Sequence, residues 1–377
     1  MPDKHLHIIS FDIPYPPNYG GVIDVYYKLK TLHNLGIKIH LHCFEYPGRD
    51  RADQLNQFCE NVYYYPRITG IRSAFSFAPY IVVSRKSEAM MHNLLKDDHP
   101  ILFEGLHSCY YIDDQRIKNR IKVYRESNIE HRYYFNLFKV DVNLRNKIYF
   151  LMASIKLRMY QKVLRHADLM LAVSMHDTRY LQKHFPGKQI YHLPSFHANE
   201  KVAIFPGRGD YALYHGNIEV SENEFAATYL INNVFDGLDI PLIIAGMKPR
   251  DKFRRLVETK PDVRLIANPD EEKMFDLIRN AHVNILVTFQ ATGLKLKLLN
   301  TLYNGRFCLV NDEMIAGTHL DQLCEMGNAT EELKSKLKEL FSQEFTLDEA
   351  LRRNDLLKIY YDNQVNGEKM IDLIYKL

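Results

Sequence analysis

The chain has 377 residues, of which 46% are hydrophobic and 25% are charged, and its formal net charge is +3. This length suits two globular domains, and the composition excludes a disordered chain and does not indicate a nucleic-acid partner. Nothing at the start resembles a secretion signal, and no run of about 18 apolar residues occurs, so we expect neither export nor a membrane-spanning helix.

The cysteines are scattered, odd in number and never spaced as Cys-x-x-Cys. They are Cys43, Cys59, Cys109, Cys308 and Cys324. Such a set does not build a disulfide framework, so we expect reduced thiols and a cytoplasmic protein.

The first 44 residues predict a strand, a loop, a helix and a second strand. His5–Phe11 is a short apolar run, and from Val22 onward apolar side chains recur at helical spacing until Gly36. Ile37–Phe44 then alternates like a strand. A β–α–β unit of this kind builds a parallel sheet, and its loop lies at the carboxyl end of the first strand.

That loop, Pro14–Val22 with the sequence PYPPNYGGV, is the first candidate binding element. Prolines make it rigid, while Gly20 and Gly21 let the backbone approach a ligand and turn helix N–H groups toward an anion. The alternative is a tight turn without a ligand. The Gly-x-Gly-x-x-Gly fingerprint is missing, which weighs against a dinucleotide.

Short apolar runs continue along the chain as alternating strands and helices. In the first half the predicted strands are Pro100–Leu106, Ile121–Glu126, Asp168–Ser174 and Gln189–Pro194. In the second half they are Tyr211–Asn217, Pro241–Met247, Val263–Pro269, Val283–Phe289 and Arg306–Asp312. The stretch Phe196–Asp210 lacks a period and contains proline and glycine, which is typical of a linker.

The helix starts of the second half are marked by capping residues. Ser221 with Glu224 fits a capping box, and Asp270 precedes an amphipathic stretch. We therefore predict an α/β fold of two Rossmann-like, doubly wound domains facing a cleft, with residues 1–200 in the first domain and 201–360 in the second.

The most informative segment of the second half is Thr288–Gly305, TFQATGLKLKLLNTLYNG, where a strand end passes into a helix. Gly293, Lys295 and Lys297 stand near the start of that helix, and Asn300 lies on the same polar strip as Lys297. A lysine beside free backbone N–H groups suits a diphosphate. The alternative is a solvated lysine face.

Further polar residues follow predicted strands, where ligands of parallel sheets bind. Glu104 and His107 end one strand of the first half, and Glu130 follows the next. Gly216 and Asn217 end the first strand of the second half, so their N–H groups are candidates for donor phosphates. His107 is the preferred site residue, against the alternative of a structural histidine. Glu130 either caps a helix or orients a hydroxyl group.

Two other patterns leave alternatives open. His40 and His42 share one strand face, but no third ligand has a recognisable spacing, so we interpret them as a structural pair and predict no metal site. Residues 144–166 combine basic and apolar side chains without any acidic residue. This segment is either a peripheral contact with an anionic membrane or a packed helix with a solvated basic face.

Several segments, in this order, resemble glycosyltransferase family 4, whose members are retaining sugar transferases with the GT-B fold. The segments are Pro14–Phe44, Tyr124–Tyr134, Ala167–Ser174, Leu213–Ala227 and Ala291–Gly305. The resemblance covers both halves of the chain and rests on the order of the segments and their place at strand ends. It also implies that the C-terminal helix, residues 361–377, crosses back to the first domain.

The resemblance implies a hexosyltransferase of polysaccharide biosynthesis that moves sugar from a nucleotide-sugar donor to a saccharide or a lipid-linked glycan. Such an enzyme needs no bound metal and no cofactor, and it works in the cytoplasm or at the inner face of the membrane. The diphosphate would be held by Gly293, Lys297 and the Gly20–Gly21 loop. His107 would contact the transferred sugar, and Asn300 would lie near the ribose.

The sequence departs from the family at the donor site. Two glutamates eight positions apart are usual there, and Thr292 and Asn300 stand at those positions. The Asn300 amide oxygen still accepts hydrogen bonds, without the assistance of a charge. This departure keeps two alternatives open, namely a catalytically decayed scaffold subunit and a GT-B nucleotide-sugar epimerase.

Overall fold

The computed structural model describes residues 3–46, 48–70, 76, 78–141, 143–289 and 296–377. The chain forms two compact units. The first comprises residues 1–198 and 361–377, and most of the second lies in 199–291 and 295–360.

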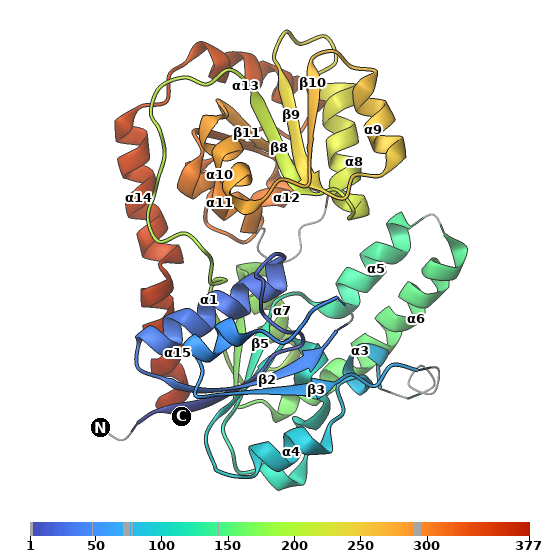
Figure 1. Cartoon of the computed structure of the whole chain (residues 1–377), viewed down its shortest axis with the longest axis vertical. Coiled ribbons are helices and arrows are strands. Elements are labelled where there is room, and N and C mark those ends of the chain that lie inside the picture. Colours follow the sequence, from blue (N-terminus) through green and yellow to red (C-terminus); the bar gives the residue numbers. More distant parts are fainter. Residues whose placement is uncertain (1–2, 47, 71–75, 77, 142, 290–295) are drawn as a thin grey trace. The chain divides into compact units, whose positions relative to one another are not determined.

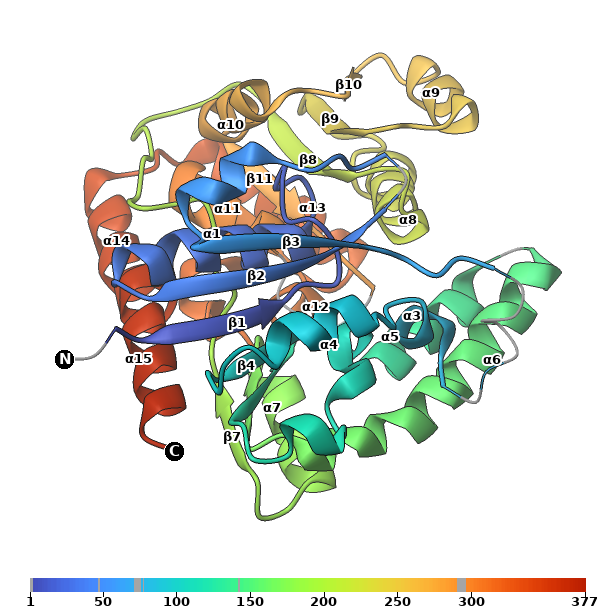
Figure 2. The ribbon, with the colours of Figure 1, turned by 60° about the horizontal axis from the view of Figure 1, so that its bottom comes forward.

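The first unit is built on a seven-stranded sheet in the order β3-β2-β1-β4-β5-β6-β7 (Figures 1 and 2). Its strands are β1 (His5–Ile9), β2 (Lys38–Glu45), β3 (Asn61–Pro66), β4 (Ile101–Glu104), β5 (Lys122–Glu126), β6 (Leu169–Ala172) and β7 (Gln189–His192). All neighbouring pairs are parallel. The order reverses between β1 and β4, which marks a doubly wound sheet.

Helices accompany the strands of this unit. They are α1 (Gly20–Asn34), α3 (Tyr80–Val83), α4 (Glu88–Leu94), α5 (Glu130–Val140), α6 (Leu144–Tyr160), α7 (Met175–His184) and α15 (Asn363–Tyr375). The C-terminal helix α15 packs against α1 (Figure 1). Gly367 allows this contact, because a Cβ there would lie 2.7 Å from Leu35 and 2.8 Å from Thr31.

Apolar residues on both faces of each strand hold the helices in place. Ile8 packs into the core shared with α1 and α15, while the next residue, Ile9, packs into the core on the other face. On β4, Leu102 likewise packs into the core shared with α1 and α15, and Phe103 packs into the core on the other face. Two-sided burial explains why these strands read as short apolar runs rather than as clean alternation.

The second unit repeats the plan with a six-stranded sheet in the order β10-β9-β8-β11-β12-β13. Its strands are β8 (Ala212–Asn217), β9 (Leu242–Met247), β10 (Val263–Ala267), β11 (Val283–Leu286), β12 (Phe307–Val310) and β13 (Glu325–Met326), all parallel. Its helices are α8 (Ser221–Tyr229), α9 (Asp251–Glu258), α10 (Glu271–Asn280), α11 (Leu296–Asn304), α12 (Asp312–Ile315), α13 (Thr330–Ser342) and α14 (Leu347–Tyr361). The prediction of two doubly wound α/β domains is confirmed.

The predicted helix ends are right in two cases and wrong in one. Gly36 follows α1 with a φ of +82°, and Asp270 caps α10 by accepting a hydrogen bond from the Lys273 N–H at 2.8 Å. The capping box at Ser221 is wrong, because α8 begins at Ser221 and Val220 holds the cap position without a side-chain hydrogen bond. In the described part of the chain, no helix combines the length and the apolarity needed to cross a bilayer.

Candidate functional site

In each sheet, the strand order reverses at one point, and ligands of doubly wound proteins bind beyond the carboxyl ends of the strands there. In the first unit this point lies between β1 and β4. The loop to Gly20 follows β1, and Gly105 and His107 follow β4. The sheet therefore brings the predicted glycine loop and the predicted histidine to the same edge.

Gly20 and Gly21 open helix α1 beside this edge. A Cβ on Gly21 would lie 2.6 Å from Cζ of Phe11, so a larger residue here would push the Phe11 ring out of its place. The ring of Phe11 in turn lies 5.4 Å from the ring of His107. The cap residue of α1, Tyr19, contributes no side-chain hydrogen bond to the first turn.

A polar clamp fixes the proline-rich loop. The Tyr19 hydroxyl donates to the Asp12 carboxylate at 2.6 Å, and the Arg49 guanidinium lies 5.1 Å from the centre of the Tyr19 ring. Arg49 also donates to the carbonyl oxygens of Ile13 at 2.6 Å and Pro16 at 2.9 Å. The loop is therefore held from outside by an arginine that the sequence pattern did not single out.

His107 and Glu130 form the most unusual pair of this edge. Nδ1 of His107 is buried and has no hydrogen-bond partner among the described residues, and Oε1 of Glu130 lies 3.8 Å away. Burial raises the pKa of Glu130 to about 8. Burial, together with the positive charges of Arg85 and Arg67, holds the pKa of His107 well below its ordinary value. Both groups are therefore mainly neutral at pH 7.

Arg85 and Arg67 are the cations that act on His107, and the sequence motifs indicated neither of them. Arg85 is 3% exposed, and its Nε donates to the carbonyl oxygen of Phe11 at 2.8 Å. Arg67 donates to the Ser84 hydroxyl at 3.0 Å and stacks on the Tyr46 ring at 4.0 Å. Neither arginine stands in a recognisable motif, because their contacts are made only after the sheet has formed.

Glu104, the other predicted catalytic residue of this strand end, lies inside the unit. Its carboxylate accepts a hydrogen bond from Lys28 at 2.6 Å, and the same ammonium group lies 2.9 Å from Asp24. Asp24 is also paired with Arg125 at 3.2 Å. This network of charges ties α1 to β4 and β5, so Glu104 has a structural partner and its catalytic role stays a prediction.

In the second unit, the strand order reverses between β8 and β11. Gly216 and Asn217 end β8, and Lys297 lies in the first turn of α11. Asn223 joins them: its side-chain N–H donates to the carbonyl oxygen of Asn217 at 2.9 Å, and its amide oxygen accepts from Lys297 at 3.1 Å. The Lys297 ammonium also lies 5.1 Å from the centre of the Tyr214 ring.

Asn300 lies one turn further along α11, where it is half-buried. Its amide oxygen accepts a hydrogen bond from the Asn199 amide nitrogen at 2.9 Å, and the Asn199 amide oxygen accepts one from Asn304 at 2.8 Å. Gly293, Lys295 and Thr292 lie outside the described residues. The structure thus brings Gly216, Asn217 and Lys297 together, through an asparagine that sequence reasoning missed.

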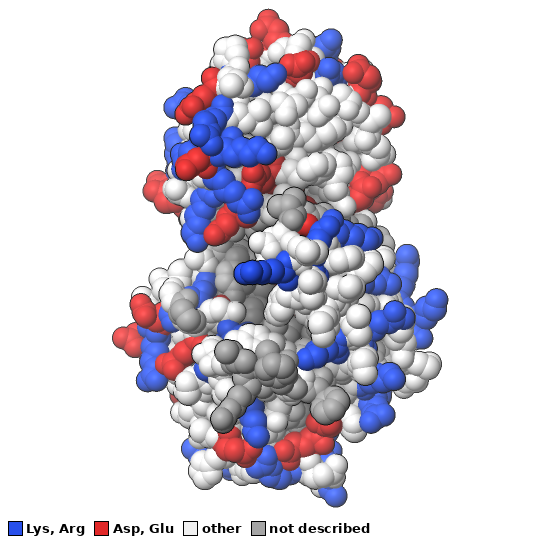
Figure 3. All heavy atoms as spheres, turned by 90° about the vertical axis from the view of Figure 1, so that its right-hand side faces the viewer, with Lys and Arg blue, Asp and Glu red and all other residues white. Residues whose placement is uncertain are grey.

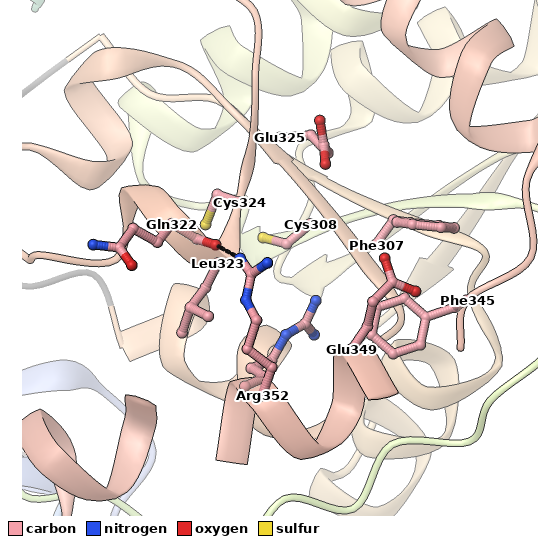
Figure 4. Close-up of a pocket in the computed structure, with 10 residues that line it drawn as sticks. Phe307, Cys308, Gln322, Leu323, Cys324, Glu325, Phe345, Glu349 and Arg352 are labelled. Atoms are coloured by element: carbon pink, nitrogen blue, oxygen red, sulfur yellow. Dashed lines mark hydrogen bonds between the residues drawn. The ribbon is translucent and has the colours of Figure 1, made fainter. Parts of the chain in front are cut away.

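A separate cavity of about 100 Å³ lies between β12, β13 and α14 (Figure 4). The thiols of Cys308 and Cys324 face each other at its wall, beside Arg352. Small-molecule sites commonly enclose about 300–1,000 Å³, so a nucleotide sugar does not fit here. Of the predicted site residues that the structure describes, none lines this cavity.

Comparison with known proteins finds few relatives by sequence and many by structure. No model of a known protein family matches the chain. An uncharacterized 44.6 kDa protein in the cps region of Klebsiella pneumoniae is 26% identical over 337 residues, which cover 84% of this chain and 86% of that protein.

Solved structures match almost the whole chain. A mutant of S. aureus TarM, in complex with fondaparinux, alpha-GlcNAc-glycerol and UDP, has a TM-score of 0.70 at 8% identity and covers 98% of this chain and 99% of its own. A glycosyltransferase from Rickettsia africae has a TM-score of 0.67 at 11% identity, and the match covers 100% of this chain and 99% of that protein. The chain has the GT-B fold.

A third GT-B neighbour is the UDP-forming alpha,alpha-trehalose-phosphate synthase of Burkholderia xenovorans, in complex with glucose-6-phosphate. Its TM-score is 0.63 at 11% identity, and 99% of this chain and 100% of that chain are covered. At such low identities the likeness establishes the fold alone.

Proposed function

We propose that the protein is a glycosyltransferase of family 4 that moves a sugar from a nucleotide-sugar donor to a hydroxyl group of a saccharide or a lipid-linked glycan. The observation that carries this proposal is the match of GT-B glycosyltransferases along at least 98% of the chain. It is supported by polar residues at the reversal points of both sheets.

The second unit is the proposed donor site. Lys297 and the backbone of Gly216 and Asn217 would bind the diphosphate, whose negative charge grows as the sugar leaves. A cation and N–H dipoles fixed in place stabilise that charge, so the proposed transfer does not depend on a metal. Two neighbours carry UDP in their names, so UDP-sugars are the first donors to test.

The first unit is the proposed acceptor site. His107 would contact the transferred sugar, and Glu130 would orient the acceptor hydroxyl. A carboxyl group with a pKa of about 8 is suited to exchange a proton near neutral pH. Retention of the anomeric configuration is part of the proposal through the resemblance to family 4.

Helix α6 and the short 3-10 helix Gln161–His166 that follows it are the proposed membrane contact, and they would hold the protein at the inner face of the membrane. Large apolar side chains of α6 are exposed, namely Leu144, Ile148, Tyr149, Met152, Ile155 and Met159. In Figure 3, Lys and Arg side chains and uncharged residues make up most of the face of the first unit near these helices. Exposed apolar and basic groups together suit an anionic lipid surface, and such a surface would bring a lipid-linked acceptor to the first unit.

One observation favours the alternative of a decayed donor site. The Asn300 amide oxygen, which would face the ribose, already accepts a hydrogen bond from Asn199. A scaffold subunit of a larger glycosyltransferase assembly would need no ribose contact at this position.

A thermal-shift screen against UDP-, GDP-, ADP- and dTDP-sugars tests the proposal. Ligand at about 100 times its Kd stabilises a protein by about 2.7 kcal/mol, so a true donor raises Tm measurably. We expect one base to raise Tm and Lys297→Ala to abolish the shift, while the exposed Lys273→Ala keeps it. A folded protein that responds to no nucleotide would instead favour the scaffold.

A further inference from the structure

The amino-terminal edge of the first sheet carries a cluster of imidazole groups on one face. Side chains of a strand alternate between the two faces, so His5 and His7 of β1 share the face of Ile9, and His40 and His42 of β2 share the face of Phe44. His99, two residues before β4, joins this face. Strand pairing sets His7 beside His40, which brings the three segments together.

Three of these histidines form a compact group: His5, His40 and His99. Nδ1 of His5 lies 3.0 Å from Nε2 of His40, and the rings of His5 and His99 stack with their centres 4.4 Å apart. One ring nitrogen from each of the three lies within 4.8 Å of the other two. His5 and His99 are half-buried, so solvent reaches the group.

The other two histidines of the face are fully used in a chain of hydrogen bonds. Tyr65 Oη lies 2.9 Å from His42 Nδ1, and His42 Nε2 lies 2.8 Å from His7 Nδ1. His7 Nε2 then lies 3.0 Å from both oxygens of Asp97. Each ring nitrogen of His7 and His42 has a hydrogen-bond partner in this row of side chains. These two histidines are therefore not counted as ligands beside His5, His40 and His99.

The surrounding residues hold the three histidines in position. The amide nitrogen of Asn61 lies 3.0 Å from Nδ1 of His40. With this amide turned over, its oxygen would accept from Nδ1–H, and Nε2 would exchange its hydrogen bond with His5 for the metal ion. The backbone of His99 is fixed by the Asp97 carboxylate at 3.0 Å and by Arg120 Nε at 2.8 Å. The Tyr375 hydroxyl donates to the His5 carbonyl oxygen at 2.7 Å.

We propose that His5, His40 and His99 bind a divalent transition metal ion of the zinc type. Two nitrogen ligands at Zn–N distances of about 2.0–2.1 Å are about 3.4 Å apart in a tetrahedron. The hydrogen-bonded nitrogens of His5 and His40, now 3.0 Å apart, therefore need to separate only slightly. Three imidazoles leave the fourth position to water. The ion sits at the opposite end of the strands from Glu130 and His107, where it links β1, β2 and the segment before β4.

Sequence spacing alone hides this site. His5, His40 and His99 stand on three separate segments, without the short spacing of a His-x-x-x-His ligand pair. Only the strand order, with β1 between β2 and β4, brings them into reach of one ion. The site is thus independent of the proposed sugar transfer.

Equilibrium dialysis of the chelator-treated full chain against Zn²⁺, and separately Co²⁺, tests the proposal. We expect one ion per chain and, for Co²⁺, the visible absorption of a four-coordinate nitrogen site. His99→Ala and His5→Ala should each weaken binding at least about tenfold, and Asn61→Ala about 10- to 100-fold. The matched control is His92→Ala, an exposed histidine of α4, which should bind as the unchanged protein does.

Circular dichroism of each variant separates loss of the site from loss of the fold. Because His99 and His5 are half-buried, their variants should stay folded, and a folded His99→Ala protein without stoichiometric Zn²⁺ supports the site. Two results would overturn it. One is the absence of stoichiometric binding of either ion to the unchanged chain, and the other is equal binding by His99→Ala and His92→Ala.

Discussion

Nδ1 of His107 and Oε1 of Glu130 lie 3.8 Å apart, in a part of the first unit where burial favours the neutral form of both groups. At neutral pH the pair is an imidazole beside a protonated carboxyl group. Above pH 8 the carboxyl group loses its proton and the pair gains a negative charge. The state of Glu130 therefore changes within an accessible pH range.

Glu130→Gln should remove a pH dependence of stability. The pKa of Glu130 is raised from 4.5 to about 8 in the folded protein, so the folded state binds the proton more tightly than the unfolded state. The free energy of unfolding is then highest below about pH 4.5 and falls as pH rises to 8, by on the order of 4 kcal/mol. Urea unfolding should find equal stabilities at pH 5 and a more stable Glu130→Gln protein at pH 8.5.

The control for this experiment is Glu60→Gln, an exposed glutamate of the same unit. It removes one carboxylate without removing a buried one. If Glu60→Gln and Glu130→Gln changed the stability profile alike, burial would not be the cause. The same variants, assayed for transfer once a donor is known, separate the proton exchange of Glu130 from its contribution to stability.

Glu104→Gln should destabilise the first unit by about 3 kcal/mol, because it leaves the buried Lys28 with one carboxylate fewer. Glu88→Gln is the matched control: Glu88 is paired with Arg116 at 2.9 Å on the surface, and its loss should cost less than about 1 kcal/mol. Denaturant unfolding measures both. A Glu104→Gln protein with unchanged stability and abolished transfer would reverse our interpretation, since Glu104 would then act in the chemistry.

The sheets could be predicted from the sequence because strands buried on both faces appear as short apolar runs between loops. Two strands were not predicted. β3 (Asn61–Pro66) is an edge strand with three tyrosines, of which Tyr63 and Tyr64 are half-buried, and β13 has two residues only. The error at Ser221 has a local cause: Asn217 accepts from the Glu219 N–H at 3.1 Å and from Asn223, so asparagines close this turn.

The positions of the candidate site residues could be predicted only where the order of strands along the chain determines them. Gly20, His107, Gly216 and Lys297 follow strands that meet at reversal points, and a strand order can be inferred from β–α–β units. Arg85 and Asn223 carry no such signal, because their roles come from contacts between distant segments.

Asn300→Glu should strengthen nucleotide binding if the donor site is intact. A carboxylate accepts hydrogen bonds from ribose hydroxyls with charge assistance, which is worth roughly 1 kcal/mol over an amide, or about fivefold in Kd. Asn199 can donate to the new carboxylate as it does to Asn300, so the fold should persist. Calorimetric titration with the nucleotide found in the screen measures the change.

The control is Asn300→Gln, which has the same length as the glutamate variant without its charge. Equal affinities for the two variants would show that charge at this position does not reach the ribose. A loss of binding in Asn300→Glu alone would place the negative diphosphate, rather than the ribose, near Asn300.

Ile155→Ser combined with Met159→Ser should weaken binding to vesicles with anionic lipids about tenfold or more, because each buried apolar side chain contributes on the order of 1 kcal/mol. These residues are 53% and 67% exposed on α6, next to basic residues. The matched control is Leu351→Ser with Ile359→Ser. These two residues are 55% and 64% exposed, respectively, on α14 of the second unit. Vesicle flotation at low and high salt decides the matter. If only the basic residues bind the membrane, high salt should abolish binding and the serine substitutions should leave it unchanged. If α6 inserts its apolar side chains, a fraction of the binding should resist salt, and only the α6 variant should lose that fraction.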